Sequence, residues 1–167
     1  ADKKDSQEIC FVTSGRHDEF VRSRRGNADT AGEIVTTAGQ VVGRHAGIEG
    51  FTIGQRKGLG LTNPEPRYVT QIEPSLNQII IGKKEALLKN ACSMSRVNWL
   101  VTPMDFPCEV ESQIRYHSPV VSADITRNNN GYEITFQKPQ SAVTPGQSIV
   151  FYRDNVVLGG GIIEKHP

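Results

Sequence analysis

The sequence has few cysteines, no excess of either charge and no long hydrophobic run. Its longest apolar stretch, Val156 to Ile163, includes three glycines and is far shorter than the roughly 18 residues that a membrane helix needs. We therefore expect no membrane span and no membrane partner. Basic residues number 19 and acidic residues 18, for a formal net charge of +1. Any nucleic-acid binding must then come from a local patch of charge.

Cysteine and histidine are too scattered to indicate a structural metal site. The three cysteines, at positions 10, 92 and 108, lie far apart and form no Cys-x-x-Cys pair, which argues against both a disulfide scaffold and zinc. The four histidines show neither metal-ligand spacing nor the arrangement of a Ser/His/Asp site. We expect no bound metal. The opening residues, Ala-Asp-Lys-Lys-Asp, lack the apolar core of a secretory signal, so a cytoplasmic location is expected.

The periodicity of the first half predicts two pairs of strands. Residues 33–36 and 40–44 flank Thr37-Ala38-Gly39, and residues 68–72 and 78–81 flank Pro74-Ser75-Leu76-Asn77. Turn-forming residues between two alternating or β-branched runs are typical of hairpins. A helical turn or two is expected over Lys83 to Leu88. The pattern predicts a boundary between two units at about residues 83 to 90.

Strand signals then recur at short intervals to the end of the sequence. Six candidate strands cover residues 93–99, 108–116, 120–126, 132–137, 147–152 and 156–163. Their short, turn-separated pattern indicates an antiparallel barrel or sandwich, of which we favour the barrel. The predicted fold is therefore mainly β: a small central domain of α+β or β type at 15–87, and a six-stranded antiparallel β-barrel at 88–167. Residues 1–14 precede both.

Four short segments contain residues that could carry chemistry or bind RNA. Cys10 is either a reactive thiol, which needs a lowered pKa, or a buried residue between Ile9 and Phe11. Gln55-Arg56-Lys57 lies in a glycine-rich span and is either a flexible phosphate-binding loop or a solvated basic turn. Arg115-Tyr116 combines a cation with a ring that can stack on a base, or simply packs within a strand. Thr144-Pro145-Gly146-Gln147 is predicted as a type II turn that presents Gln147. Cys92 and Cys108 are expected in the core.

Five motifs together resemble the tRNA-specific 2-thiouridylase family, in the family's order and spacing. They are Asp5-Ser6-Gln7-Glu8-Ile9-Cys10-Phe11, Thr52-Ile53-Gly54-Gln55-Arg56-Lys57-Gly58-Leu59-Gly60, Arg115-Tyr116, Ala142-Val143-Thr144-Pro145-Gly146-Gln147 and Leu158-Gly159-Gly160-Gly161-Ile162-Ile163. The resemblance covers only the C-terminal part of that family. It implies that residues 1–14 are the tail of an ATP-pyrophosphatase domain, and that the barrel is similar to those of translation factors.

The resemblance also implies an activity. Members of the family are tRNA-uridine 2-sulfurtransferases that thiolate the wobble uridine of tRNAs for Lys, Glu and Gln. ATP, a co-substrate held by the N-terminal domain, adenylates the oxygen on carbon 2 of the uracil, and an enzyme persulfide then supplies sulfur. By position, Cys10 matches the persulfide-bearing cysteine. This part alone is expected to be inactive and to bind no cofactor itself.

Binding roles follow from the same resemblance. Arg115, Tyr116 and Gln147 match family positions that contact tRNA, and Gln55, Arg56 and Lys57 are further candidates. The implied partners are tRNA, not DNA, and a sulfur-relay protein or cysteine desulfurase as the sulfur donor. The competing interpretation is an RNA-binding β-barrel module without a catalytic role of its own. Reactivity of Cys10 with a sulfane-sulfur donor distinguishes the two.

Overall fold

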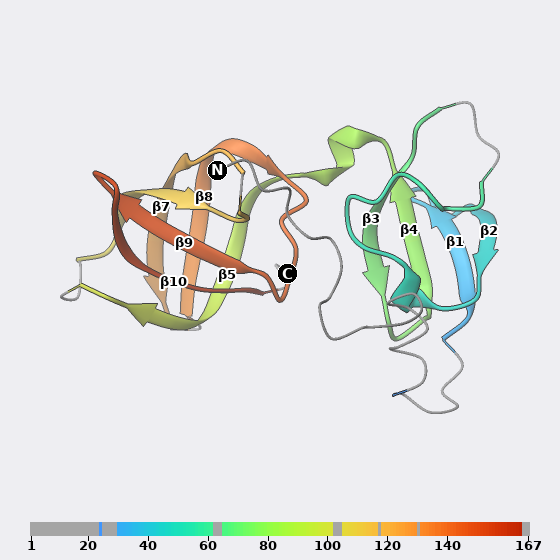
Figure 1. Ribbon diagram of the computed structural model, residues 1–167, viewed down its shortest axis with the longest axis horizontal. Coiled ribbons are helices and arrows are strands. Elements are labelled where there is room, and N and C mark those ends of the chain that lie inside the picture. Colours follow the sequence, from blue (N-terminus) through green and yellow to red (C-terminus); the bar gives the residue numbers. More distant parts are fainter. Residues whose placement is uncertain are drawn as a thin grey trace, which may run out of the picture. The chain divides into compact units, whose positions relative to one another are not determined.

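The computed structural model describes residues 24, 30–61, 65–101, 105–116, 118–129 and 131–164. The chain divides into two compact units between Lys83 and Lys84, and each is considered by itself. The fold is mainly β (Figure 1). Within residues 30–164, apart from the gaps named above, helical structure is limited to two 3-10 turns, η1 (Ile48–Gly50) and η2 (Lys84–Leu87).

The first unit contains a four-stranded sheet in the order β2-β1-β4-β3. Its strands are β1 (Gly32–Thr36), β2 (Val41–His45), β3 (Tyr68–Glu73) and β4 (Gln78–Gly82). Both predicted hairpins are confirmed, because β1 pairs with β2 and β3 with β4, each antiparallel. A parallel pairing of β1 with β4 joins the hairpins.

The core of the first unit explains why these segments form strands. Strands β1, β3 and β4 each contribute buried residues to this core, and their β-branched side chains suit a pleated, half-buried surface. Ile48 from η1 and Leu59 from the glycine-rich span pack on the same cluster, which comprises Ile34, Ile48, Leu59, Val69, Ile79 and Ile81. The loop from residue 51 to 61 is therefore anchored to the sheet by its own apolar residues.

The second unit is a closed six-stranded barrel in the order β10-β5-β8-β7-β6-β9. The strands are β5 (Leu88–Trp99), β6 (Cys108–Gln113), β7 (Val121–Asn128), β8 (Gly131–Ser141), β9 (Ser148–Arg153) and β10 (Val156–Glu164). All neighbouring pairs are antiparallel. The predicted barrel is confirmed, and its closure leaves no unpaired strand edge.

The barrel has its own core, separate from that of the first unit. Twelve buried residues from all six strands and the turn after β6 fill it, including the large side chains of Phe136 and Phe151. Cys92 is 1% exposed and belongs to this core, as expected, whereas Cys108 is only half-buried against it. Trp99 stacks on Phe151 with ring centroids 5.8 Å apart. The interior is a packed core.

The glycine triplet of β10 lies where the strand is irregular on both sides. Register shifts occur between Val157 and Gly159 against β9, and between Gly160 and Ile162 against β5. A Cβ atom at Gly160 would lie 2.4 Å from the carbonyl oxygen of Ile149. The predicted structural role of these glycines, bulges and close backbone packing, is confirmed.

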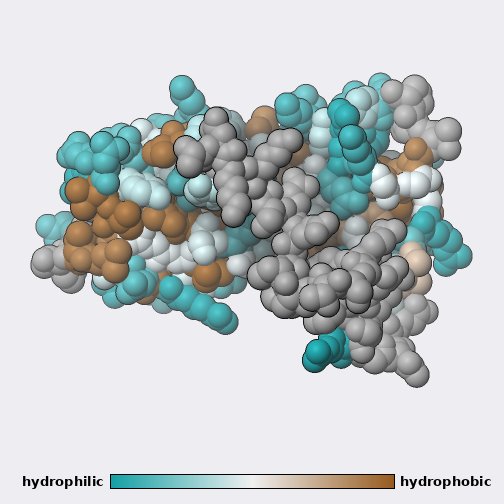
Figure 2. All heavy atoms as spheres, viewed as in Figure 1, coloured by the Kyte–Doolittle hydropathy of each residue, from teal (hydrophilic) through white to brown (hydrophobic). Residues whose placement is uncertain are grey.

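Apolar side chains also reach the outer surface of the barrel. Figure 2 shows them gathered on the barrel unit, and the exposed large hydrophobic residues there include Leu100, Val156 and Val157. Apolar atoms make up a large part of the surface of any folded protein, so this exposure by itself does not indicate a binding site. No helix in the described residues is long and apolar enough to cross a membrane.

Candidate functional site

One end of the barrel brings together the loop after β6 and the loop after β8. Strand β6 ends at Gln113, and the chain then turns, with the Ser118 amide and hydroxyl both donating to the Arg115 carbonyl oxygen at 3.1 and 2.8 Å. The prediction that the strand continues to residue 116 is therefore wrong. Ile114 is the last residue to enter the core, and the turn lifts Arg115 and Tyr116 to the surface.

Arg115 joins these two loops. Its Nη2 donates to the carbonyl oxygen of Ala142 at 2.6 Å and to that of Ser141 at 3.3 Å. Hydrogen bonds from an ionised donor are stronger than neutral ones, so this guanidinium holds the two loops together. Tyr116, next to it, is 77% exposed, the highest value among the large hydrophobic residues described as exposed. The arrangement offers an open aromatic ring beside a fixed cation, as stacking on a splayed-out base requires.

The segment Thr144-Pro145-Gly146-Gln147 forms the predicted type II turn. The Gln147 amide donates to the Thr144 carbonyl oxygen at 3.2 Å, and Gly146 has φ +87°, as the third position of that turn demands. Gly146 N–H donates to the Ile163 carbonyl, and Ile163 N–H donates to the Gln147 carbonyl, both at 2.8 Å. This exchange is a glycine bulge against β10, and it fixes the backbone that carries Gln147.

The side chain of Gln147 has an unused acceptor. Its Oε1 is buried and has no hydrogen-bond partner among the described residues. Leaving a buried polar atom unsatisfied costs about 1 to 3 kcal/mol, and such atoms are uncommon in folded proteins. A water would satisfy it, as would a base amino group or a ribose hydroxyl of a ligand once the side chain turns toward solvent.

The first unit repeats this turn with a similar sequence. In Thr52-Ile53-Gly54-Gln55 the Gln55 amide donates to the Thr52 carbonyl oxygen at 3.0 Å, and Gly54 has φ +89°. Gly54 N–H donates to the Val69 carbonyl at 2.8 Å, and Val69 N–H donates to the Gln55 carbonyl at 2.9 Å. Each unit therefore contains a Thr-x-Gly-Gln turn that ends in a glycine bulge against a strand.

The two glutamines are used differently. Gln55 accepts a hydrogen bond from the Thr52 amide at 2.9 Å and donates through Nε2 to the Lys57 carbonyl at 3.0 Å. The amide of Gln55 therefore braces the loop from within. Arg56 and Lys57 are exposed on that braced loop, so their charges face solvent.

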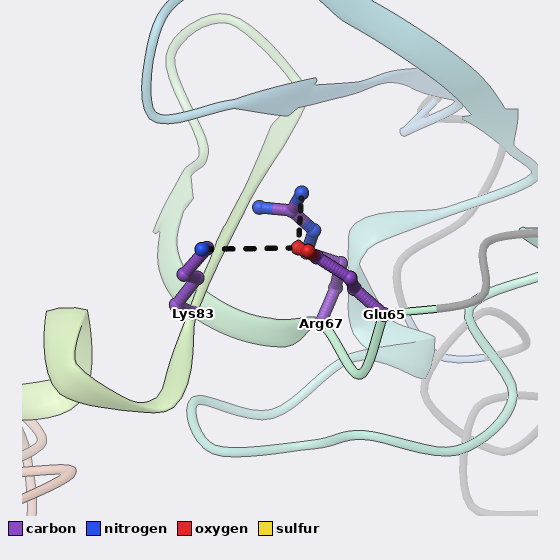
Figure 3. Close-up of polar contacts among 3 residues, drawn as sticks. All are labelled: Glu65, Arg67 and Lys83. Carbon is purple, nitrogen blue, oxygen red and sulfur yellow. Dashed lines mark hydrogen bonds and ion pairs between the residues drawn. The ribbon is translucent and has the colours of Figure 1, made fainter.

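Sequence reasoning missed a group of charged residues near this loop. Arg67 Nη2 and Lys83 Nζ both approach Glu65 Oε2, at 3.2 and 3.9 Å (Figure 3). These residues come from the start of β3 and the end of β4, which the register brings together through the pairing of Tyr68 with Gly82. The hairpin pattern was the signal that could have found them.

The two cysteines in the described residues are unsuited to thiolate chemistry. Burial raises the pKa of the Cys92 thiol to about 12. The pKa of Cys108 is also raised, mainly by burial; the charge of Arg153 acts to lower it and that of Asp124 to raise it. Only the thiolate is a good nucleophile. Within the described part of the chain, no group of His, Cys, Asp and Glu could hold a metal ion. Cys10 lies outside the described residues.

Comparisons with known proteins account for both units. Residues 18–83 match a family model described as the tRNA methyl transferase PRC-barrel domain, and residues 89–163 match one described as the aminomethyltransferase beta-barrel domain. A tRNA-specific 2-thiouridylase MnmA from Rhodopirellula baltica is 48% identical over 98% of this chain and 43% of its own length. MnmA proteins from Chlorobium phaeobacteroides and Symbiobacterium thermophilum are 44% and 41% identical, over 98% and 99% of this chain and 47% and 43% of theirs.

The chain belongs to the MnmA family of tRNA-specific 2-thiouridylases. It corresponds to the middle and C-terminal domains of the family and spans about half the length of the curated relatives it matches. The two domain models fall on the two structural units, since one ends at residue 83 and the other lies within the barrel unit.

Proposed function

We propose that this chain is the part of a tRNA 2-thiouridylase that carries sulfur and binds tRNA. The complete enzyme would use ATP, bound by the family's N-terminal domain, for 2-thiolation of the wobble uridine in tRNAs for Lys, Glu and Gln. The observation that supports this most strongly is the identity of 41% to 48% to three MnmA proteins over almost the whole chain. Such similarity extends through both units rather than through one reusable barrel.

The proposed sulfur carrier is Cys10. A persulfide requires a soft, polarisable nucleophile that receives sulfur from a sulfane-sulfur donor, such as a relay protein or a cysteine desulfurase. The family's second cysteine, in the N-terminal domain, would attack Cys10 Sγ. This step forms a disulfide with Cys10 and releases hydrosulfide, which adds to carbon 2 of the adenylated uracil and displaces AMP. Neither Cys92 nor Cys108 is proposed to take part, because burial raises the pKa of both.

The proposed tRNA contacts are the two turns at the end of the barrel, Arg115–Ser118 and Thr144–Gln147, and the loop of the first unit that carries Gln55, Arg56 and Lys57. Tyr116 would stack on an unpaired base, Arg115 would position its ring and neutralise phosphate charge, and Gln147 would accept a hydrogen bond at its buried Oε1. In the first unit Arg56 and Lys57 would contact phosphates, and Gln55 would position the loop that carries them. We expect no DNA binding, because the contacts favour splayed-out single-stranded RNA, and we expect the enzyme to act in the cytoplasm.

A second candidate is an RNA-binding module without catalytic chemistry of its own. It is favoured by one observation: the described residues provide turns, cations and an exposed ring, but both described thiols have raised pKa values. Under this alternative Cys10 would be inert. The two candidates share the RNA contacts and differ only in the reactivity of one residue.

Sulfur loading tests the proposal. The chain is treated with a sulfane-sulfur donor, and its intact mass is compared with that of Cys10→Ala. We expect a gain of one sulfur atom, reversible by a thiol reductant, that is lost in the variant. In parallel, tRNA affinity is measured over a salt series with the chain, with Tyr116→Ala and with Tyr116→Phe. Loading at another cysteine, or no loading with normal tRNA binding, would favour the RNA-binding module instead.

A further inference from the structure

Most of the described carboxylates of the first unit lie at one end of its sheet, and most of the described cations lie at the other. At one end, Glu33 of β1 and Glu73 of β3 flank Gln78 of β4, and the Gln78 amide donates to Glu33 at 3.5 Å. Arg44 of β2 is paired in register with Glu33. Glu49 is linked to this end by Thr30, which precedes β1. The Thr30 hydroxyl donates to the Glu49 carboxylate at 2.7 Å. Among the described residues, three carboxylates and one guanidinium lie at this end.

The other end of the same sheet is positive. Arg67 and Lys83 lie there because β3 begins and β4 ends at the same level, Tyr68 opposite Gly82. Arg56 lies on the loop that runs along the free edge of β3, because Gln55 is hydrogen-bonded there to Val69. From those backbone links, the Cα atoms of Arg56 and Arg67 are at most roughly 16 Å apart. Lys57 follows Arg56 directly.

One carboxylate serves two of these cations. Arg67 and Lys83 both lie within 4 Å of Glu65 Oε2 and approach it from different sides (Figure 3). Two positive charges against one negative charge leave a surplus, to which Arg56 and Lys57 add. An oxyanion that approached Glu65 would meet Arg67 and Lys83 together.

Arg67 is the best organised member of the group. Its side chain is 25% exposed, against 66% for Lys83, and its Nε is buried without a partner in the described chain. A guanidinium has five N–H donors and matches the geometry of phosphate. Because packing already holds this side chain, little conformational entropy remains to be lost on binding.

From this arrangement we propose that Arg56, Lys57, Arg67 and Lys83, called the basic row below, bind phosphate oxygens of the tRNA backbone. The inference rests on the proposed function, and it adds Arg67 and Lys83 to the contacts named above. The row would fix the position of the RNA without reading its sequence, because phosphates carry no base identity. Glu65 would hold the two cations in place in the free protein and oppose the phosphate in the complex.

The experiment measures tRNA affinity of the full chain over a salt series. Each phosphate contact contributes about 0.7 to 0.9 to the slope of log affinity against log salt. Lys83→Gln should reduce that slope by about one contact, and Lys83→Arg should restore it. Arg44→Gln, which removes an exposed cation from the opposite end of the sheet, should leave the slope unchanged. Glu65→Gln should tighten binding, because it removes the carboxylate that pairs with Arg67 and Lys83 and would oppose the phosphate.

The outcomes separate this inference from the proposed function. If Lys83→Gln behaves like Arg44→Gln while Tyr116→Ala still weakens binding, the basic row is not an RNA contact and the barrel contacts stand. If Glu65→Gln weakens binding while its urea midpoint is unchanged, the proposed opposition to phosphate is wrong. Absence of salt-sensitive tRNA binding by the unsubstituted chain would overturn both proposals. Arg67→Gln is informative only if it unfolds at the same urea concentration as the parent chain, so Lys83 and Glu65 decide the question.

Discussion

At the residue scale, two glutamines in the same kind of turn show how one local structure serves two purposes. The amide of Gln55 is satisfied by Thr52 and Lys57, so its hydrogen bonds stabilise the loop. The Oε1 of Gln147 is buried and unsatisfied within the described chain, so it costs stability. Unsatisfied buried polar atoms are uncommon in folded proteins, and a water, an ion or a ligand is the partner that would remove the cost.

This difference predicts opposite results for two matched substitutions. Gln55→Ala should destabilise the chain by about 1 kcal/mol, because it removes two hydrogen bonds that brace the loop. Gln147→Ala should leave the free energy of unfolding nearly unchanged, since no hydrogen bond to its Oε1 is lost, and should weaken tRNA binding. Urea denaturation and tRNA titration measure the two effects. A Gln147→Ala variant that is as unstable as Gln55→Ala, with parental tRNA affinity, would contradict this account.

The buried Cys92 thiol predicts a specific dependence of stability on pH. Its pKa is raised from 9.0 to about 12 by burial, so the folded chain keeps this proton where the unfolded chain loses it. The corresponding stabilisation is complete below pH 9 and is lost as pH rises from about 9 to about 12. Cys92→Ala lacks this thiol. In urea denaturation at several pH values, the parent should lose stability more steeply above pH 9 than the variant, and parallel curves would refute the prediction.

At the scale of elements, the turn-forming residues predicted which strands pair. Register shifts and strand ends were not predictable from the sequence. Every strand pair expected from the sequence is present, because a hairpin needs only local signals. The register was less predictable: a shift between Val69 and Gln71 moves the pairing by one residue and places Tyr68, not Val69, opposite Gly82. The end of β6 was missed for a similar reason, since the Arg115–Ser118 turn depends on hydrogen bonds that composition does not show.

In the candidate site, too, local turns were predictable from the sequence and contacts between distant segments were not. The Thr144–Gln147 turn was predictable, because proline and glycine at its centre specify its type. The ties from Arg115 to Ser141 and Ala142 were not, since they join segments 26 and 27 residues apart in the chain. The grouping of Glu65, Arg67 and Lys83 likewise depends on how β3 and β4 are paired.

Strand β10 gives a prediction at this scale. In Gly160→Ala the added methyl group would lie 2.4 Å from the Ile149 carbonyl oxygen, so the β9–β10 pairing must shift. Overpacking of this kind costs about 1 to 3 kcal/mol. Val156→Thr, an exposed position on the same strand, should change stability by less than about 0.5 kcal/mol. Thermal or urea unfolding measures both, and equal stabilities of the two variants would show that the glycine is not needed for close packing.

At the scale of the whole molecule, the chain consists of two units with separate cores. The barrel core includes Phe136 and Phe151, whereas that of the first unit is built on residues such as Ile34 and Ile79. The barrel is closed, so it needs no strand from outside to complete its hydrogen bonding. Each unit contributes a Thr-x-Gly-Gln turn to the proposed function.

The barrel is therefore expected to fold alone. A chain of residues 84–167 should give dispersed NMR amide signals and a single cooperative unfolding transition, because all six strands and the core lie within it. The matched comparison is the transition of the full chain monitored through Trp99, the only tryptophan of the sequence and part of the barrel. A barrel fragment with collapsed, poorly dispersed signals would show that it depends on the first unit.

The most direct test of the central claim is reconstitution of 2-thiouridine formation. The chain is combined with the N-terminal half of a related MnmA protein, tRNA for Lys, ATP and a persulfide donor, and the modified nucleoside is measured by mass spectrometry. The account predicts 2-thiouridine that requires ATP and is lost with Cys10→Ala, while Cys92→Ala retains it. Equal product formation with and without Cys10 would contradict the claim that this residue carries the sulfur.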